Sequence, residues 1–195
     1  MEGGECLEKM IGLMSDFSGV DISQLDLDHH KEYNFAELFE KCKSIEDYDF
    51  LWQQYSKCRD VQNKQYKIGL VHGDFSWSNF IYTLEDEMYI LDNDHLRTDA
   101  LIQDIARALI FFAFNDLEFS QEKANRVLEL YTNMSNITFD IDEVLSWTRL
   151  LLIFMILETY YYTEVVRTVS KGELEKSSYN QGYKYLFYKL KNLVF

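Results

Sequence analysis

The sequence has 195 residues, 47% of them hydrophobic, which is enough to bury a full core as one domain and argues against disorder. Its formal net charge of -14 argues against a nucleic-acid partner and is compatible with a cationic substrate, although acidic faces also simply keep a protein in solution. The longest apolar run, 150–157, is well short of the roughly 20 residues that a membrane span requires, so no membrane partner is expected. Three cysteines without a C-x-x-C pair, and no secretory signal after Met1, favour a reducing cytoplasm.

Helical and strand-like patterns follow one another along the chain. Helices are predicted, in chain order, at 5–13, at 34–42, at 44–65, from Thr98 or Asp99 to 112, at 120–134, at 140–169 and at 173–193. Three short strands are predicted at 67–71, 80–82 and 88–91, with a turn at 84–87 between the last two. The helix at 44–65 begins with Ser44-x-x-Asp47, which is similar to a capping box. No linker or repeat marks a boundary, so we expect a single domain over 1–195.

The most informative segment carries polar residues at fixed offsets between the predicted strands. The chain reads Val-His-Gly-Asp-Phe-Ser-Trp-Ser-Asn at 71–79 and Tyr-Ile-Leu-Asp-Asn-Asp at 89–94. In a kinase-type catalytic loop an Asp accepts the proton of the substrate hydroxyl, an Asn five residues later binds Mg²⁺, and an Asp at the end of a later strand binds the metal that bridges the phosphates. His72, Asp74 and Asn79 fit that loop, and Asp92 or Asp94 can supply the last ligand.

These segments, together with Asp104-Ile105-Ala106, resemble the aminoglycoside phosphotransferase and choline kinase superfamily, whose pattern is HGDxxxxN, then IDF(D/E), then D(L/I)A. The opening Glu-Gly-Gly-Glu-Cys at 2–6 is similar to the hinge of the CotS-type spore-coat kinase-like proteins, and the abundance of Tyr and Phe suits that branch. The sequence departs from the family in having Asn93 where Phe is usual, and in having nothing similar to the small lobe.

The resemblance implies an α+β, mainly α-helical fold: the C-terminal (large) lobe of a protein-kinase-like fold, with a small β-hairpin insert carrying the catalytic loop. Residues 1–6 would be hinge-like and the small lobe would be absent. The chain would then begin where the small lobe ends, as a truncated or split form. Its exposed cleft side would favour self-association or a separate small-lobe chain.

The resemblance also implies a role for each motif residue. Asp74 would be the catalytic base, and Asn79 and Asp92 would be the Mg²⁺ ligands. His72 would orient the loop, and Asp94 matches an acid whose role varies within the family.

Asp104 falls in a helical apolar pattern, where it is either buried and paired or on the solvated face. The resemblance implies a buried carboxylate that ties the catalytic loop to the next helix. We therefore expect its carboxylate to accept hydrogen bonds from backbone N–H groups of residues 72–74.

The predicted function is transfer of the γ-phosphoryl group of ATP to a hydroxyl of a small molecule, such as an aminoglycoside- or choline-like acceptor. ATP binding by this chain alone is expected to be weak or absent, because no G-x-G-x-x-G loop and no V-A-I-K-like strand precede Asp74. The alternative is a non-catalytic structural or binding protein of the spore coat that retains the kinase-like fold and has no need of nucleotide or Mg²⁺.

Each motif residue also has a plainer interpretation. Gly-Asp is ordinary turn chemistry, and a His beside it is more often hydrogen bonded than reactive. A metal-dependent hydrolase could use the same imidazole and carboxylate groups, namely His72, Asp74, Asp92, Asp94 and His95. Such a site has no need of Asn79, and the joint match of several offsets favours the kinase-like interpretation.

Overall fold

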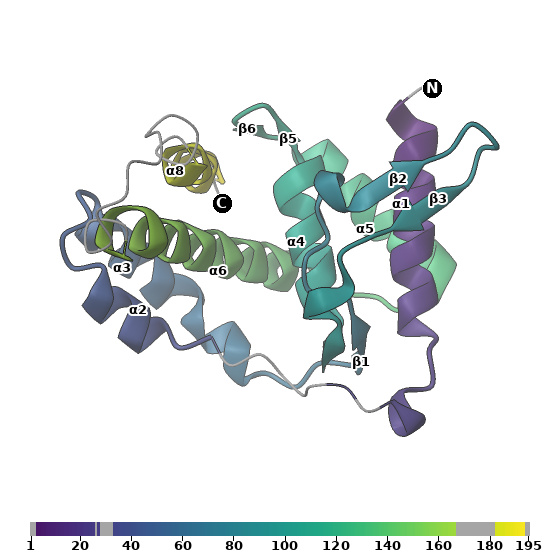
Figure 1. Ribbon diagram of the computed structural model, residues 1–195, viewed down its shortest axis with the longest axis horizontal. Coiled ribbons are helices and arrows are strands. Elements are labelled where there is room, and N and C mark those ends of the chain that lie inside the picture. The colour runs from purple at the N-terminus through teal and green to yellow at the C-terminus, as the bar shows by residue number, and fades with distance from the viewer. Residues whose placement is uncertain (1–2, 26, 28–32, 167–181, 194–195) are drawn as a thin grey trace. The chain divides into compact units, whose positions relative to one another are not determined.

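The computed structural model describes residues 3–25, 27, 33–166 and 182–193 (Figure 1). These residues belong to two compact units, the first drawn from 1–31, 64–114 and 120–148, and the second from 32–63, 115–119 and 149–195. The single domain over 1–195 stays a prediction. Residues 3–6 of the predicted hinge-like segment belong to the first helix.

The described α-helices are α1 (Gly3–Ser18), α2 (Phe35–Lys41), α3 (Tyr48–Cys58), α4 (Ile102–Phe112), α5 (Gln121–Ser135), α6 (Ile141–Tyr160) and α8 (Gly182–Asn192). A π-helical turn at Tyr161–Val166 follows α6, so the predicted helix 140–169 extends beyond the described residues, as does the start of the one at 173–193. The strands are β1 (Ile68–Val71), β2 (Phe80–Tyr82), β3 (Met88–Ile90), β4 (Arg97–Ala100), β5 (Phe114–Asn115) and β6 (Glu118–Phe119), which pair as β1–β4, β2–β3 and β5–β6. No described helix is both long and apolar enough to cross a bilayer.

Helix α4 is the core of the first unit. Nine of its eleven residues are buried, and α5 packs against both α1 and α4. Thr148, in the part of α6 that belongs to this unit, donates a hydrogen bond of 3.2 Å from its hydroxyl to the Ala106 carbonyl oxygen. Because α4 is covered in this way, any polar side chain on it must find a partner inside the protein.

Strand β4 was not predicted. The helix expected to begin at Thr98 or Asp99 begins at Ile102, and residues 97–100 form a strand antiparallel to β1, with Val71 opposite Arg97. Burial of β1 explains the correction, because buried backbone N–H and C=O groups need partners and the hairpin strands pair with each other. Tertiary pairing therefore outweighed the local helical pattern.

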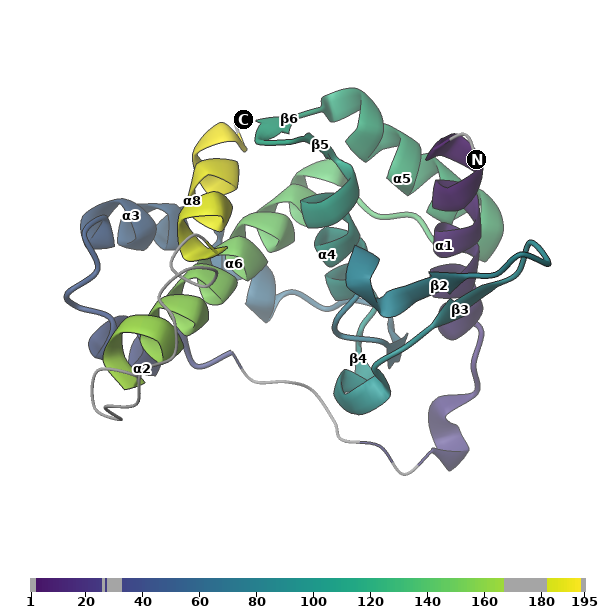
Figure 2. The same cartoon turned by 45° about the horizontal axis from the view of Figure 1, so that its top comes forward.

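The hairpin β2–β3 has one covered and one open face. Ile81 and Tyr89 are directly opposite each other and are 47% and 50% exposed, whereas their neighbours along each strand are only partly exposed. The hairpin lies beside α1 in both views (Figures 1 and 2). Lys9 of α1 holds the turn, since its ammonium donates to the Asp86 carbonyl oxygen at 2.8 Å and to the Tyr82 hydroxyl at 3.2 Å.

In the second unit, aromatic side chains pack around the C-terminal half of α6. The Phe35 ring of α2 lies 6.0 Å from that of Phe154, and the buried Cys42 thiol donates to the Leu157 carbonyl oxygen at 3.3 Å. Asn34 caps α2 through a bond of 3.1 Å from the Glu37 N–H. The predicted helix at 44–65 is wrong at its start, because residues 42–47 turn before α3 and no side chain caps that helix.

Candidate active site

The predicted catalytic loop connects β1 to β2 and lies wholly within the first unit. Gly73 has a φ of +76°, in the left-handed region that favours glycine. A Cβ at this position would collide with the Arg97 guanidinium and lie 2.8 Å from the His95 carbonyl oxygen. The loop therefore turns sharply at a point where only glycine fits.

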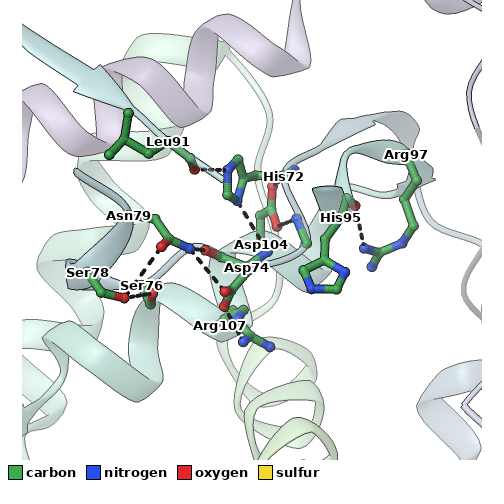
Figure 3. A network of polar contacts seen from close by, with 11 residues as sticks. His72, Asp74, Ser76, Ser78, Asn79, Leu91, His95, Arg97, Asp104 and Arg107 are labelled. Carbon is green, nitrogen blue, oxygen red and sulfur yellow. Dashed lines mark hydrogen bonds and ion pairs between the residues drawn. The ribbon is translucent and has the colours of Figure 1, made fainter. Parts of the chain in front are cut away.

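Asp104 of α4 holds the start of this loop (Figure 3). Its carboxylate accepts hydrogen bonds from the backbone N–H of His72 at 2.6 Å and of Gly73 at 2.9 Å, and the side chain is almost fully buried. Burial raises the pKa of Asp104, while the two N–H groups and the nearby Arg97 charge act against that rise. The contact is of the kind that the sequence led us to expect for this residue.

His72 uses both of its ring nitrogens within the protein. Its Nε2 lies 2.9 Å from the Leu91 carbonyl oxygen, and its Nδ1 accepts a hydrogen bond of 3.3 Å from the Asp74 N–H. A carbonyl oxygen only accepts, so Nε2 carries the hydrogen and Nδ1 does not. The fully buried ring can orient the loop, but it has no nitrogen left for a metal, and the hydrolase alternative loses its first ligand.

Asp74 and Asn79 are joined side chain to side chain. Asn79 Nδ2 donates to the Asp74 carbonyl oxygen at 2.8 Å and to its carboxylate Oδ2 at 3.0 Å. Asn79 Oδ1, on the other side of the amide, accepts a long bond of 3.4 Å from the Ser78 hydroxyl. The amide therefore orients the carboxylate while keeping its own oxygen for another partner.

Arg107 completes the environment of Asp74. One terminal nitrogen of its guanidinium, Nη2, forms an ion pair with Asp74 Oδ1 (Figure 3). Burial acts to raise the pKa of Asp74, but the Arg107 charge, the hydrogen bonds from Asn79 and Arg107, and the charge of His95 hold that pKa below its ordinary value. Asp74 is thus an ionised carboxylate at neutral pH.

The backbone at Asp92 lies close to the backbone at Asn79. The Leu91 N–H donates to the Asn79 carbonyl oxygen at 2.7 Å, so the following residue, Asp92, leaves β3 close to Asn79. The Asp92 side chain is exposed, makes no capping bond, and stands on a left-handed backbone with a φ of 59°. Strained positions of this kind gather at functional sites. Asp94 is exposed on the next turn.

Within the described residues, no group of three or more His, Cys, Asp or Glu side chains lies close enough together to hold a metal ion. Asn79 and the oxygens of a bound phosphate are further oxygen ligands that do not belong to these four residue types. Mg²⁺ commonly binds through one or two carboxylates together with substrate phosphates and water. The roles of Asp74, Asn79 and Asp92 in catalysis and metal binding stay predictions.

A second buried network, which the sequence analysis missed, lies behind the loop. Arg97 Nε pairs with Asp99 Oδ2 at 2.9 Å, and its Nη2 donates to Gln103 Oε1 at 2.7 Å. Gln103 Nε2 in turn donates to Asp99 Oδ1 at 2.8 Å. The Arg97 guanidinium fills the space beside Gly73, so this network also supports the loop.

Arg107 was also missed, although the sequence holds a signal for it. Asp104 and Arg107 are three residues apart and are the only charged residues of α4. Residues three apart on a helix share a face. A carboxylate and a guanidinium on one face of a buried helix could have been assigned to the same loop.

We predict that Asp104→Ala lowers the melting temperature. The change leaves the N–H groups of His72 and Gly73 without an acceptor, and each stranded donor costs about 1–3 kcal/mol. Thermal unfolding followed by circular dichroism measures the effect, with the exposed Asp16→Ala in α1 as the matched control. Equal melting temperatures for the two variants would contradict the structural role of Asp104.

Residues 8–137 match the APH family, described as the phosphotransferase enzyme family. No sequence among the curated proteins matches this chain.

Solved structures share the fold at low sequence identity. A choline/ethanolamine kinase family protein from Mesorhizobium loti is 14% identical with a TM-score of 0.68, over 96% of this chain and 62% of its own. Choline kinase LicA from Streptococcus pneumoniae is 14% identical with a TM-score of 0.66, over 97% and 65%. LicA in complex with AMP is 15% identical with a TM-score of 0.65, over 96% and 62%. This chain thus spans less than two thirds of their length. The predicted fold, a mainly α-helical, kinase-like large lobe with a small hairpin, is confirmed.

Proposed function

We propose, from the premise that this chain belongs to the phosphotransferase enzyme family, that it transfers the γ-phosphoryl group of ATP to a hydroxyl of a small molecule. The observation that carries the proposal is the pairing of Asp74 with Asn79 in a loop that Asp104 holds. Phosphoryl transfer depends mainly on positioning and electrostatics, and a rigid loop bearing one ionised carboxylate and one amide supplies both.

Asp74 acts as the base in this mechanism. Its carboxylate is ionised at neutral pH because Arg107 and Asn79 lower its pKa, so it can accept a hydrogen bond from the acceptor hydroxyl. That bond aims the hydroxyl oxygen at the phosphorus, and the proton passes to Asp74 as the new bond forms. The Asn79 amide keeps the carboxylate in one orientation throughout.

Asn79 Oδ1 and the Asp92 carboxylate are the groups that would hold Mg²⁺. The Asn79 amide nitrogen is already bonded to Asp74, which leaves its oxygen for the metal, and the Asp92 side chain is exposed. Oxygen ligands of this kind suit Mg²⁺, which neutralises charge on the phosphates when bound.

The exposed apolar face of the hairpin is proposed to contact the nucleotide base. Ile81, Tyr89 and Leu91 are 47%, 50% and 41% exposed, and Leu91 directly precedes Asp92. A purine ring has two apolar faces that can lie against such side chains. One of the solved structures with this fold is a complex with AMP.

A cationic acceptor fits the surroundings of the loop. Trp77 is 48% exposed, its indole N–H donates to the Phe111 carbonyl oxygen at 3.3 Å, and its ring packs edge-on against Phe112 at 4.4 Å. An anchored indole ring three residues after Asp74 can bind an ammonium or similar cation through its face. The net charge of -14 would also attract cations. We therefore favour an aminoglycoside- or choline-like alcohol.

The second candidate is a CotS-type protein of the spore coat that keeps this fold without turnover. The ion pair of Arg107 with Asp74 favours it, because a guanidinium bound to the candidate base could keep substrate away. The segment 2–6 and the Tyr and Phe content support that branch. For the phosphotransferase we propose a cytoplasmic location, and for the second candidate a location in the spore coat.

We predict that the chain transfers radiolabelled phosphate from Mg-ATP to at least one of choline, ethanolamine and kanamycin. Asp74→Asn should lower kcat by roughly 10²–10⁴-fold, because an amide cannot accept the hydroxyl proton. The control for loss of one charge is Asp16→Asn, because Asp16 is exposed on α1 and distant in sequence from Asp74. Equal rates for wild type and Asp74→Asn, or no transfer to any acceptor, would refute the proposal.

We predict a specific magnesium defect for Asp92→Asn. Asparagine tolerates the left-handed backbone of this position, so the change removes a charged ligand without altering the turn. The Mg²⁺ concentration that gives half-maximal transfer should rise at least about tenfold. Initial rates across a Mg²⁺ titration at fixed ATP measure it, with Asp16→Asn again as control. An unchanged Mg²⁺ requirement would remove Asp92 from the metal site.

A further inference from the structure

Helix α4 touches the catalytic loop at two successive points (Figure 3). Asp104 binds the backbone of His72 and Gly73, and Arg107, three residues later, binds the side chain of Asp74. The Arg107 and Asp74 side chains are 19% and 24% exposed, so their ion pair lies at the boundary between the core and the open side of the loop. Arg107 is therefore placed where a ligand of Asp74 would come.

The guanidinium has more donors than Asp74 uses. Nη2 is bonded to Asp74 Oδ1, while Nε is buried without a hydrogen-bond partner among the described residues. Within the same residues Nη1 makes no hydrogen bond either. The Arg107 side chain is 19% exposed, so its terminal nitrogens, unlike the buried Nε, can meet a ligand on the open side of Asp74. An anion bound there would accept hydrogen bonds from the terminal N–H groups that Asp74 does not use.

Phosphoryl transfer provides such an anion. Charge spreads over the three equatorial oxygens of the transferred group, and enzymes place cations against them. Among the described residues, Arg107 is the cationic side chain that forms an ion pair with Asp74.

We propose that Arg107 is a further catalytic residue, which keeps Nη2 on Asp74 and donates from its other terminal N–H groups to the transferred phosphoryl group. This inference rests on the proposed function. In the step it assists, the acceptor oxygen forms a bond to the γ-phosphorus and the bond to the β–γ bridging oxygen breaks. ADP leaves with that electron pair, and the hydroxyl proton passes to the Asp74 carboxylate. Arg107 neither gains nor loses a proton.

The two roles of Arg107 support each other. A guanidinium is planar, permanently charged and able to donate to two anions at once, whereas a Lys ammonium is a single point charge. Bridging Asp74 and the phosphoryl group with one rigid plane fixes the distance between base and phosphorus. It also offsets the repulsion between the carboxylate and the phosphate oxygens.

The test compares Arg107→Met and Arg107→Lys with wild type in the transfer assay, measuring kcat and the KM for acceptor and for ATP. Arg107→Met should lower kcat roughly 10²-fold while the acceptor KM changes little, because the contact is made to the transferring group. Arg107→Lys should retain an intermediate kcat. Arg126→Met is the control, since Arg126 is an exposed arginine that pairs with Glu8 and Glu129.

A purely structural role is separated by chemical rescue. Arg107→Ala should regain part of its lost kcat when guanidinium or ethylguanidinium is added at millimolar concentration, whereas wild type and Arg126→Met should not respond. If Arg107→Ala and Arg107→Met do not fold, Arg107→Lys decides, with a melting temperature near wild type and a clearly lower kcat expected.

Each other outcome overturns the inference. Unchanged kcat in the Arg107 variants, with transfer by wild type, would remove Arg107 from catalysis and leave the proposed function standing. A higher kcat in these variants than in wild type would show that the ion pair of Arg107 with Asp74 inhibits transfer. A wild-type chain that transfers to no acceptor would overturn the proposed function and this inference with it.

Discussion

The carboxylate of Asp104 is the constraint on which the site depends. It accepts two backbone N–H groups, from His72 at 2.6 Å and from Gly73 at 2.9 Å, where β1 ends and the loop turns. These donors would otherwise be buried without partners. The loop is thereby fixed to a helix that is almost entirely covered, and the position of Asp74 follows from a rigid core rather than from a surface segment.

Arg97 imposes a second constraint on the same loop. Arg97 is buried with Asp99 and Gln103, and its guanidinium lies in the space that a side chain at Gly73 would need. The same Arg97 donates to the His95 carbonyl oxygen at 3.2 Å, on the turn that follows Asp92. The catalytic loop at Gly73 and the turn at His95 are therefore both in contact with the Arg97 guanidinium. Networks of this kind are favourable only when every member is satisfied, which explains why three polar side chains are buried together here.

The sequence predicted the parts of this site that are formed by residues close together along the chain. The offsets of His72, Asp74 and Asn79, the strand before them and the hairpin after them can be recognised without a structure. The buried contact of Asp104 came from a family resemblance and not from periodicity. The kinase-like fold is confirmed, whereas the closeness to the CotS-type branch is not shown.

What escaped prediction depends on contacts distant in sequence. Residues 97–100 carry a helix-compatible pattern, yet they form β4 because β1 requires a partner. Arg107 lies 33 residues from Asp74, and the ion pair exists only once α4 is packed. The helix start predicted at Ser44 is wrong for a local reason. A capping-box pattern allows a helix to begin but does not require it, and here the chain turns before α3 begins at Tyr48.

The most direct measurement of the central claim is amide hydrogen exchange by NMR. If Asp104 holds the loop, the amides of His72 and Gly73 exchange slowly in the wild type. In Asp104→Ala they exchange roughly tenfold faster or more relative to amides of α5, which serve as the internal reference. Fast exchange of both amides in the wild type, or equal protection in the variant, would contradict the account.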